Sequence, residues 1–337
     1  MGGQTLRRVL IIQTAFLGDV ILATGLVEKI HQHYPDTEID FLLRKGNESL
    51  LENHPIINEV IIFNKSETKY LNLLKVIRKI RHKKYDLIAN IQRYFTTGII
   101  TIFSNAAITI GFDKNPLSYF FSKKIKHDFD GYHEIERNHE LIAWFTDNNP
   151  AKPRLYPQKK NLEKVARYQD NSYICIAPAS VWFTKQFPVE KWLELISKIT
   201  LHIQVYLIGG PDDYLLCEEI CKKSKSTQVS NLCGAIDLLD TAALMGGAVL
   251  NIVNDSAPMH IASAMNAPTC AIYCSTLPAL GYGPLSAESR IVEIKEHLYC
   301  RPCGIHGRKN CPEGHFRCAY DINIEEIIEM INNKIKK

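Results

Sequence analysis

Residues 7–20 read RRVLIIQTAFLGDV and place a short apolar run directly before a polar turn and a helical pattern. The run from Arg7 to Gln13 is apolar at successive positions, which is typical of a strand buried on both faces of a parallel sheet. A helix is expected from Val20 to about Tyr34, with Pro35 after it as a stop. A buried strand followed by a crossover helix is the building unit of an α/β fold.

The rest of the chain repeats this alternation of short apolar runs and helical patterns. The rhythm stops in TDNNPAKPRLYPQKKN (146–161), which collects Pro, Asn and Lys as an exposed connection does. We therefore expect two doubly wound domains, 1–150 and 165–337, joined by a linker at about 151–164. Further strands are predicted at 38–43, 59–64, 85–92, 107–112, 173–180, 204–210, 249–254 and 269–274, and helices at 47–55, 70–84, 189–199, 212–224, 238–248 and 258–266.

The amino-acid composition excludes several classes of protein. The chain has 337 residues, of which 46% are hydrophobic and 23% charged, so it is neither a disordered segment nor a disulfide-stapled miniprotein. The net charge of +4 is too small to predict nucleic-acid binding by itself. No apolar run approaches the roughly 20 residues that span a bilayer. Gln13 and Asp19 interrupt the stretch where a signal peptide stays apolar, so we expect a cytoplasmic protein.

The turn after the first strand carries a candidate catalytic base. In open α/β sheets ligands bind beyond the carboxyl ends of the strands. Gly18 allows a sharp turn there and places Asp19 at the start of the next helix. The helix dipole favours an ionised carboxylate at that position, as a general base at neutral pH requires. The structural alternative is an N-cap aspartate that only holds the helix.

Two turns in the second half suit a phosphate-bearing ligand. In residues 177–188, Ser180 and Thr184 offer hydroxyl groups and Lys185 a positive charge. In residues 254–260, Asp255 and Ser256 precede a helix whose first backbone N–H groups make an anion site. The simpler interpretation is a solvated lysine in the first turn and a packed histidine, His260, in the second.

The ten cysteines fall into two groups. Six stand singly or in apolar stretches, where a reduced cysteine packs as a small hydrophobe. The other four form a Cys-rich segment, 300–318, that also contains His306 and His315. Four thiolates over so short a span are able to make a structural zinc site, and reduced structural thiols or a redox pair are the alternatives. The four are Cys300, Cys303, Cys311 and Cys318.

Taken together, these motifs resemble glycosyltransferase family nine, the lipopolysaccharide heptosyltransferases that use ADP-heptose in a GT-B fold. The resemblance covers nearly the whole chain. It implies two Rossmann-like domains facing a cleft. It is carried by VLIIQTAFLGDVILATGLVEKIHQHYP (9–35), HPIINEVIIF (54–63), HEIERNHELIAWF (133–145), APASVWFTKQFPVEKWLEL (177–195) and NDSAPMHIASAMNAPTCAIYCSTLPALGYGP (254–284).

The resemblance implies a role for each motif. Asp19 matches the catalytic base and Lys185 the lysine near the donor phosphates. The donor-binding turn matches Asp255, Ser256, Ala257 and His260, with Ala257-Pro258 where the family usually has a glycine. Ser180 and Thr184 join the donor side. The acceptor side in the N-terminal domain is assigned Thr14, Gly18, Gln92 and Arg93.

The implied reaction is inverting sugar transfer without a catalytic metal. Asp19 would take a proton from the acceptor hydroxyl, while Lys185 and the helix start at Ser256 stabilise the departing nucleoside diphosphate. The expected partners are a nucleotide-sugar donor and a glycolipid or oligosaccharide acceptor, with no nucleic acid. We expect the basic helix 70–84 and Lys123, Lys124 and Lys126 to meet anionic core sugars or the inner membrane face.

Two other functions stay open at this stage. A sugar-nucleotide epimerase shares the GT-B architecture and binds a nucleoside diphosphate, but it needs no acceptor, so product analysis separates the two. A zinc-dependent nucleic-acid-binding module would use the Cys-rich segment and the basic helix. It leaves Asp19 and both phosphate-ready turns unexplained, and its binding would depend steeply on salt.

Overall fold

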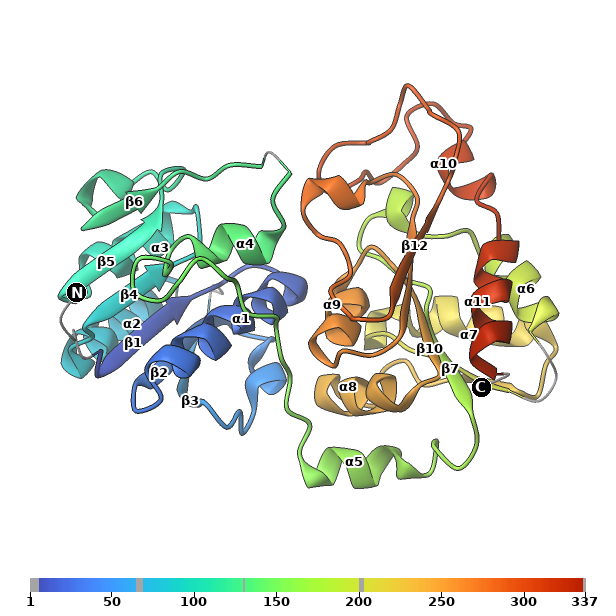
Figure 1. Cartoon of the computed structure of the whole chain (residues 1–337), viewed down its shortest axis with the longest axis horizontal. Helices are drawn as coiled ribbons and strands as arrows, with labels where there is room; N and C mark the ends of the chain where they lie inside the picture. The colour runs from blue at the N-terminus through green and yellow to red at the C-terminus, as the bar shows by residue number, and fades with distance from the viewer. Residues whose placement is uncertain (1–5, 65–68, 130, 200–202, 336–337) are drawn as a thin grey trace. The chain divides into compact units, whose positions relative to one another are not determined.

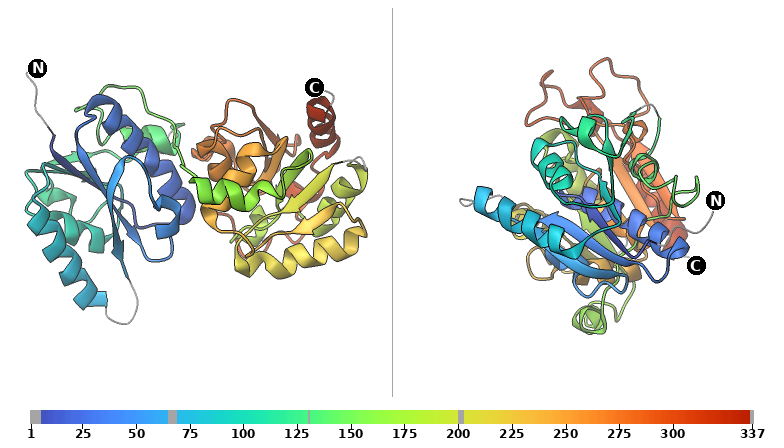
Figure 2. Two further views of the ribbon diagram at one scale, coloured as in Figure 1. Left: turned by 90° about the horizontal axis from the view of Figure 1, so that it is seen from below. Right: turned by 90° about the vertical axis from the view of Figure 1, so that its left-hand side faces the viewer.

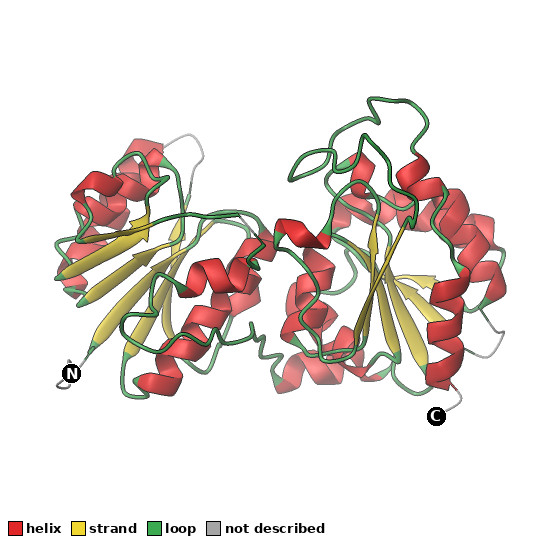
Figure 3. Cartoon of the chain, turned by 45° about the horizontal axis from the view of Figure 1, so that its top comes forward, coloured by secondary structure: helices red, strands yellow, loops and turns green. Residues whose placement is uncertain are grey.

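The computed structural model describes every residue except 1–5, 65–68, 130, 200–202 and 336–337. The chain divides into unit 1, Met1–Tyr156, and unit 2, Pro157–Lys337 (Figure 1). Each unit contains its own six-stranded parallel sheet, and helices cover the sheet of each unit (Figure 3). The break between the units falls inside the predicted linker.

Unit 1 has the strand order β3-β2-β1-β4-β5-β6. The chain runs outward from β1 in one direction and then returns to β4 on its other side, so the winding reverses between β1 and β4. The elements are β1 (Arg8–Ile12), α1 (Leu17–His33), β2 (Glu38–Arg44), η1 (Glu48–Leu51), β3 (Ile57–Phe63), α2 (Lys69–Lys83), β4 (Leu87–Asn90), α3 (Phe95–Ile102), β5 (Ile108–Phe112), η2 (Ser118–Phe120), β6 (Lys123–Ile125) and α4 (Glu134–His139).

Unit 2 has the order β12-β11-β10-β7-β8-β9 and reverses between β7 and β10 (Figure 2). The elements are α5 (Lys159–Ala166), β7 (Tyr173–Ala177), η3 (Phe183–Lys185), α6 (Val189–Lys198), β8 (Gln204–Leu207), η4 (Pro211–Asp213), α7 (Tyr214–Ser224), β9 (Val229–Asn231), α8 (Leu238–Gly247), β10 (Leu250–Asn254), α9 (Ala257–Ala264), β11 (Thr269–Tyr273), η5 (Pro278–Leu280), β12 (Ser289–Glu293), α10 (Arg317–Tyr320) and α11 (Glu325–Ile335).

The central strands are buried along their whole length, as the continuous apolar runs predict. Every residue of β7, β10 and β11 is buried. The predicted linker 151–164 needs a correction, because its last part belongs to helix α5. That helix is fixed to α8 of unit 2 by Asn161 Nδ2, which donates to Asp240 Oδ1 at 2.7 Å, and by the Lys164–Asp240 ion pair at 2.5 Å. One buried hydrogen bond and one ion pair to the buried Asp240 make this segment a structural part of unit 2.

A search of the described helices found none with the length and apolar character needed to cross a membrane.

Helix α1 carries the candidate base and is held by a close backbone contact at Gly25. A Cβ at this position would come within 2.7 Å of the carbonyl oxygen of Ala151, in the segment that returns to α1 from α4. The same segment is tied down by the Arg154 N–H, which donates to Thr24 Oγ1 at 2.9 Å. Only glycine therefore lets the two backbones approach this closely.

We expect Gly25→Ala to destabilise unit 1 by about 1–3 kcal/mol, because the added methyl group must push a backbone carbonyl aside. Gly246→Ala in α8 is the matched control, since its Cβ would meet only the flexible end of Met265 at 3.2 Å. The midpoint of urea-induced unfolding measures both. Equal midpoints for the two variants would contradict the close contact.

Candidate functional site

The candidate base Asp19 lies in the first turn of α1. The helix begins at Leu17, earlier than predicted, so Asp19 is its third residue and not its N-cap. Its Oδ2 accepts a hydrogen bond from the backbone N–H of Phe16, the N-cap residue, at 3.2 Å. This bond is the reciprocal half of a capping box. It fixes the carboxylate at the carboxyl end of β1, beside the point where the sheet reverses.

The environment of Asp19 raises its pKa to about 6. Burial is the largest cause, and the negative charge of Glu134 adds to it. The Phe16 N–H and the Arg93 guanidinium act in the opposite direction. A carboxylate with this pKa is ionised at neutral pH and still accepts a proton readily, which is the property of a general base.

Glu134 is presented by the short helix α4 and is buried with a charged partner. Arg137 Nε and Nη2 donate to its Oε2 at 3.0 and 2.7 Å. The Arg137 guanidinium lies over the ring of Phe129 at 4.9 Å, and Arg93 lies over the same ring at 5.5 Å. Arg137 therefore holds the Glu134 carboxylate in place near Asp19.

The predicted acceptor-side residues divide into buried and exposed groups. Thr14 and Gln92 are buried, and Gln92 Nε2 donates to Gln13 Oε1 across the reversal between β1 and β4. Gly18 lies partly exposed in the first turn of α1, and Arg93 is exposed. Arg93 is therefore the member of the predicted set that is best placed to reach a ligand.

In unit 2 the structure brings Lys185 and Asp255 together. Lys185 ends η3, after β7, and its Nζ lies 2.6 Å from Oδ2 of Asp255, after β10. The same oxygen accepts a hydrogen bond from Thr276 Oγ1 at 2.7 Å. Asp255 is buried while Lys185 is partly exposed, so the carboxylate holds the ammonium group at the carboxyl edge of the sheet.

The loop that carries Lys185 is clamped by Asn254, the last residue of β10. Asn254 Nδ2 donates to the Pro178 carbonyl oxygen at 2.7 Å, and its Oδ1 accepts from the Phe187 N–H at 3.1 Å. The two bonds hold the beginning and the end of the loop. Asn254 is fully buried, and it bridges the reversal between β7 and β10.

Helix α9 begins beside this pair. Ser256 is its N-cap, Ala257 its first residue, and Pro258 lies in the first turn, where its missing N–H costs no hydrogen bond. The N-terminus of a helix attracts anions. His260, one turn further on, is buried, and its ring lies edge-on to that of Tyr282 at 6.4 Å.

The prediction for Thr184 needs a correction. Thr184 is only 1% exposed, and its Oγ1 accepts hydrogen bonds from Ser275 Oγ at 2.9 Å and from the Arg308 N–H at 2.7 Å. Its hydroxyl therefore ties the Cys-rich segment to the Lys185 loop and does not face a ligand. Ser180 is partly exposed, and its carbonyl oxygen accepts from Gln186 Nε2 at 2.6 Å.

Four residues of these two sites were missed by the reasoning from sequence. Two of them could have been predicted from their positions. Asn254 is the last residue of β10, and Thr276 lies three residues after the end of β11. Glu134 and Arg308 had no such signal, because one comes from a six-residue helix and the other from an irregular segment far along the chain.

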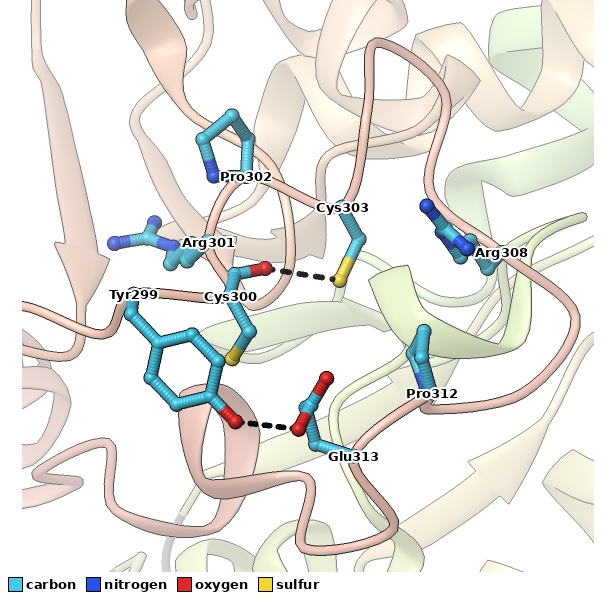
Figure 4. Close-up of a pocket in the computed structure, with 8 residues that line it drawn as sticks. All are labelled: Tyr299, Cys300, Arg301, Pro302, Cys303, Arg308, Pro312 and Glu313. Atoms are coloured by element: carbon cyan, nitrogen blue, oxygen red, sulfur yellow. Dashed lines mark hydrogen bonds between the residues drawn. The ribbon is translucent and has the colours of Figure 1, made fainter.

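The Cys-rich segment does not support the predicted zinc site. Cys318 belongs to the apolar core of unit 2, and Cys300 and Cys311 pack against it. Cys303 Sγ donates to the Cys300 carbonyl oxygen at 3.4 Å, and both residues line a pocket of about 430 Å³ (Figure 4). Across the described residues, no group of three or more His, Cys, Asp or Glu side chains is arranged to hold a metal ion. All ten cysteines are free thiols.

Comparisons with known proteins agree with these features. The sequence model of glycosyltransferase family 9 (heptosyltransferase) matches residues 73–315. Lipopolysaccharide heptosyltransferase 3 of Escherichia coli is 29% identical over 278 residues, covering 77% of this chain and 82% of that protein.

Two solved structures share the fold over nearly their whole lengths. The family 9 glycosyltransferase of Veillonella parvula DSM 2008 superposes with a TM-score of 0.84 at 22% identity, covering 98% of each chain. The ADP-heptose lipopolysaccharide heptosyltransferase II of Escherichia coli superposes with a TM-score of 0.81 at 20% identity, covering 97% of this chain and 98% of that one. The predicted GT-B fold is confirmed. The chain belongs to glycosyltransferase family 9 and is a glycosyltransferase.

Proposed function

We propose that this enzyme transfers heptose from ADP-heptose to the core of a lipopolysaccharide, with inversion at the anomeric carbon. The carrying observation is the Lys185–Asp255 ion pair, which holds an ammonium group beside the N-terminus of α9 in unit 2. The names of the relatives support the substrates, since they act on lipopolysaccharide and one is named for ADP-heptose. Neither the epimerase nor the nucleic-acid-binding module is favoured by family membership.

The donor side stabilises the leaving group. As the glycosidic bond breaks, negative charge grows on the diphosphate, and a fixed ammonium group lowers the energy of that charge. Asp255 and the Asn254 clamp hold Lys185 in place before the donor arrives. The N-terminus of α9, from Ser256 and Ala257, adds backbone N–H groups for the same diphosphate. These groups neutralise the diphosphate in our proposal, so no metal ion is assigned a role.

The acceptor side activates the nucleophile. Asp19 takes the proton of the acceptor hydroxyl. At the same time the acceptor oxygen attacks the anomeric carbon from the face opposite the diphosphate. Because Arg93 is exposed beside Asp19, it is suited to an anionic group on the core sugars. We place the reaction on the cytoplasmic side of the inner membrane, where unit 1 meets the acceptor and unit 2 holds the donor.

Calorimetric titration with ADP, ADP-heptose, GDP-sugars and UDP-sugars tests the donor. We expect ADP and ADP-heptose to bind and Lys185→Ala to weaken both by about 10- to 100-fold, the worth of a charge-assisted contact. Lys191→Ala is the control, because that lysine is also partly buried and paired with a carboxylate, Glu194, at 2.9 Å. Absence of binding by every nucleotide tested would overturn the proposal.

Asp19→Asn separates binding from chemistry. The amide keeps the shape of the side chain and cannot accept the proton, so we expect kcat to fall by about 10²- to 10⁴-fold. The affinity for ADP should stay within about twofold, because Asp19 belongs to unit 1 and the donor groups to unit 2. Mass spectrometry of the acceptor product measures the rate. A variant with wild-type kcat would exclude Asp19 as the base.

The pH profile tests the effect of Glu134 on the base. Since Asp19 must be ionised to act, kcat/KM should rise with pH through the Asp19 pKa of about 6. Glu134→Gln removes a negative charge that raises this pKa, so the acidic limb should move to lower pH. Glu140→Gln, exposed at the other end of the same helix, is the control and should leave the limb in place. An unshifted limb in Glu134→Gln would contradict the coupling.

A further inference from the structure

Unit 1 exposes large aromatic side chains next to its acceptor side. Tyr94 and Phe95, at the start of α3, are 63% and 56% exposed, and Tyr119 and Phe120, in η2, are 83% and 65% exposed. We define these four residues as the aromatic patch. Tyr and Phe rings in this position bury little of their apolar surface within the protein, so their exposure points to a partner.

The two halves of the aromatic patch are held together by the side chain of Asn115. Asn115 Nδ2 donates to the carbonyl oxygen of Tyr94 at 3.1 Å, while its Oδ1 accepts from the Leu117 N–H at 3.0 Å. A Cβ on Gly98 of α3 would come within 2.5 Å of Asn115 Oδ1, so the loop lies directly against the helix. The start of α3 and the loop that leads into η2 therefore form one continuous support for the aromatic patch.

The chain around η2 is strongly basic. Residues 114–126 contain four lysines and no acidic residue. Lys114 and Lys124 are exposed. Lys123 lies over the ring of Trp144 at 4.7 Å, and that ring is itself 55% exposed. Aromatic rings flanked by lysines on an exposed surface are typical of protein segments that lie in the membrane interface.

The aromatic patch also lies close to the acceptor groups. Asn115 Nδ2 donates to the carbonyl oxygen of Gln92 at 2.9 Å, and Gln92 in turn contacts Gln13 beside Asp19. A surface that docks through the aromatic patch would therefore lie near the candidate base. Helix α2 is less suited to this role than predicted, because Lys79 and Lys83 already pair with Glu59.

We propose that the aromatic patch, together with the exposed Lys114 and Lys124, docks unit 1 on a bilayer that carries anionic lipid headgroups. The rings enter the headgroup region and the lysines pair with lipid phosphates. This proposal rests on the proposed function only in its purpose, which is to bring a lipid-linked acceptor to Asp19. Stable binding to such a surface needs both charge and apolar contact.

Vesicle co-sedimentation tests the docking. We expect the full chain to bind vesicles of phosphatidylethanolamine and phosphatidylglycerol, and to bind phosphatidylcholine vesicles far less. Tyr119→Ser with Phe120→Ser should reduce binding about tenfold or more. Lys114→Gln with Lys124→Gln should reduce it to a similar extent and weaken its dependence on salt.

Tyr214→Ser with Leu215→Ser is the matched control, because it removes a second adjacent exposed pair, 47% and 79% exposed, from unit 2. This variant should bind like the wild type. The docking proposal is overturned if the wild type fails to bind anionic vesicles, if it binds phosphatidylcholine equally well, or if the control loses as much binding as the patch variants. Unchanged thermal unfolding midpoints check that the variants fold.

A second readout keeps this proposal distinct from the proposed function. The Tyr119→Ser, Phe120→Ser variant should keep the wild-type affinity for ADP and the wild-type rate on a delipidated, water-soluble acceptor. It should lose rate only when the acceptor is embedded in vesicles. Failure of ADP binding in the wild type would reject the proposed donor, whereas normal vesicle binding by the patch variant would reject the docking surface alone.

Discussion

A parallel sheet wound in both directions from its first strand leaves a gap at its carboxyl edge where the two directions part. Asn254, a fully buried residue at the end of β10, bridges that gap in unit 2, whereas in unit 1 Gln92 bonds across it to Gln13 beside the fully buried Asn90 of β4. Asn90 Oδ1 accepts from the Gln92 N–H at 2.9 Å, and Asn254 clamps both ends of the Lys185 loop. The exposed Arg93 and the partly exposed Lys185 follow segments that these buried amides hold in place.

The two aspartates at the carboxyl edges differ because their neighbours differ. Asp19 lies near another carboxylate, Glu134, and its raised pKa suits proton transfer. Asp255 forms an ion pair with Lys185 and accepts a hydrogen bond from Thr276. These contacts suit a carboxylate that holds a cation in place. The same residue type at comparable strand ends is thus assigned two roles by its surroundings. The difference lies in which helix or loop reaches each edge.

How well the sequence predicts each part of the site depends on how far apart in the chain the interacting residues lie. Strands, their ends and the residues just after them are local, so position marks Asp19, Lys185 and Asp255 as candidates, and the family resemblance supplies their proposed roles. A role for Glu134 was not predicted, because its six-residue helix shows too little periodicity to be recognised. Its effect on the pKa of Asp19 also acts through space and not along the sequence. Thr184 was predicted to contact a ligand because its hydroxyl follows a turn suited to phosphate. The sequence does not show that this hydroxyl accepts a hydrogen bond from the N–H of Arg308, 124 residues further along the chain.

The Cys-rich segment shows why residue type and spacing alone are weak predictors of a metal. Its backbone is tied to the donor side, since the Cys303 N–H donates to the Ser275 carbonyl oxygen at 2.9 Å and the Arg308 N–H to Thr184. Packing of Cys318 into the core anchors its other end. Burial raises the pKa of Cys318 to about 12, which keeps this thiol protonated at neutral pH. Hydrogen bonds and core packing thus hold this irregular segment at both ends, beside the loop that carries Lys185.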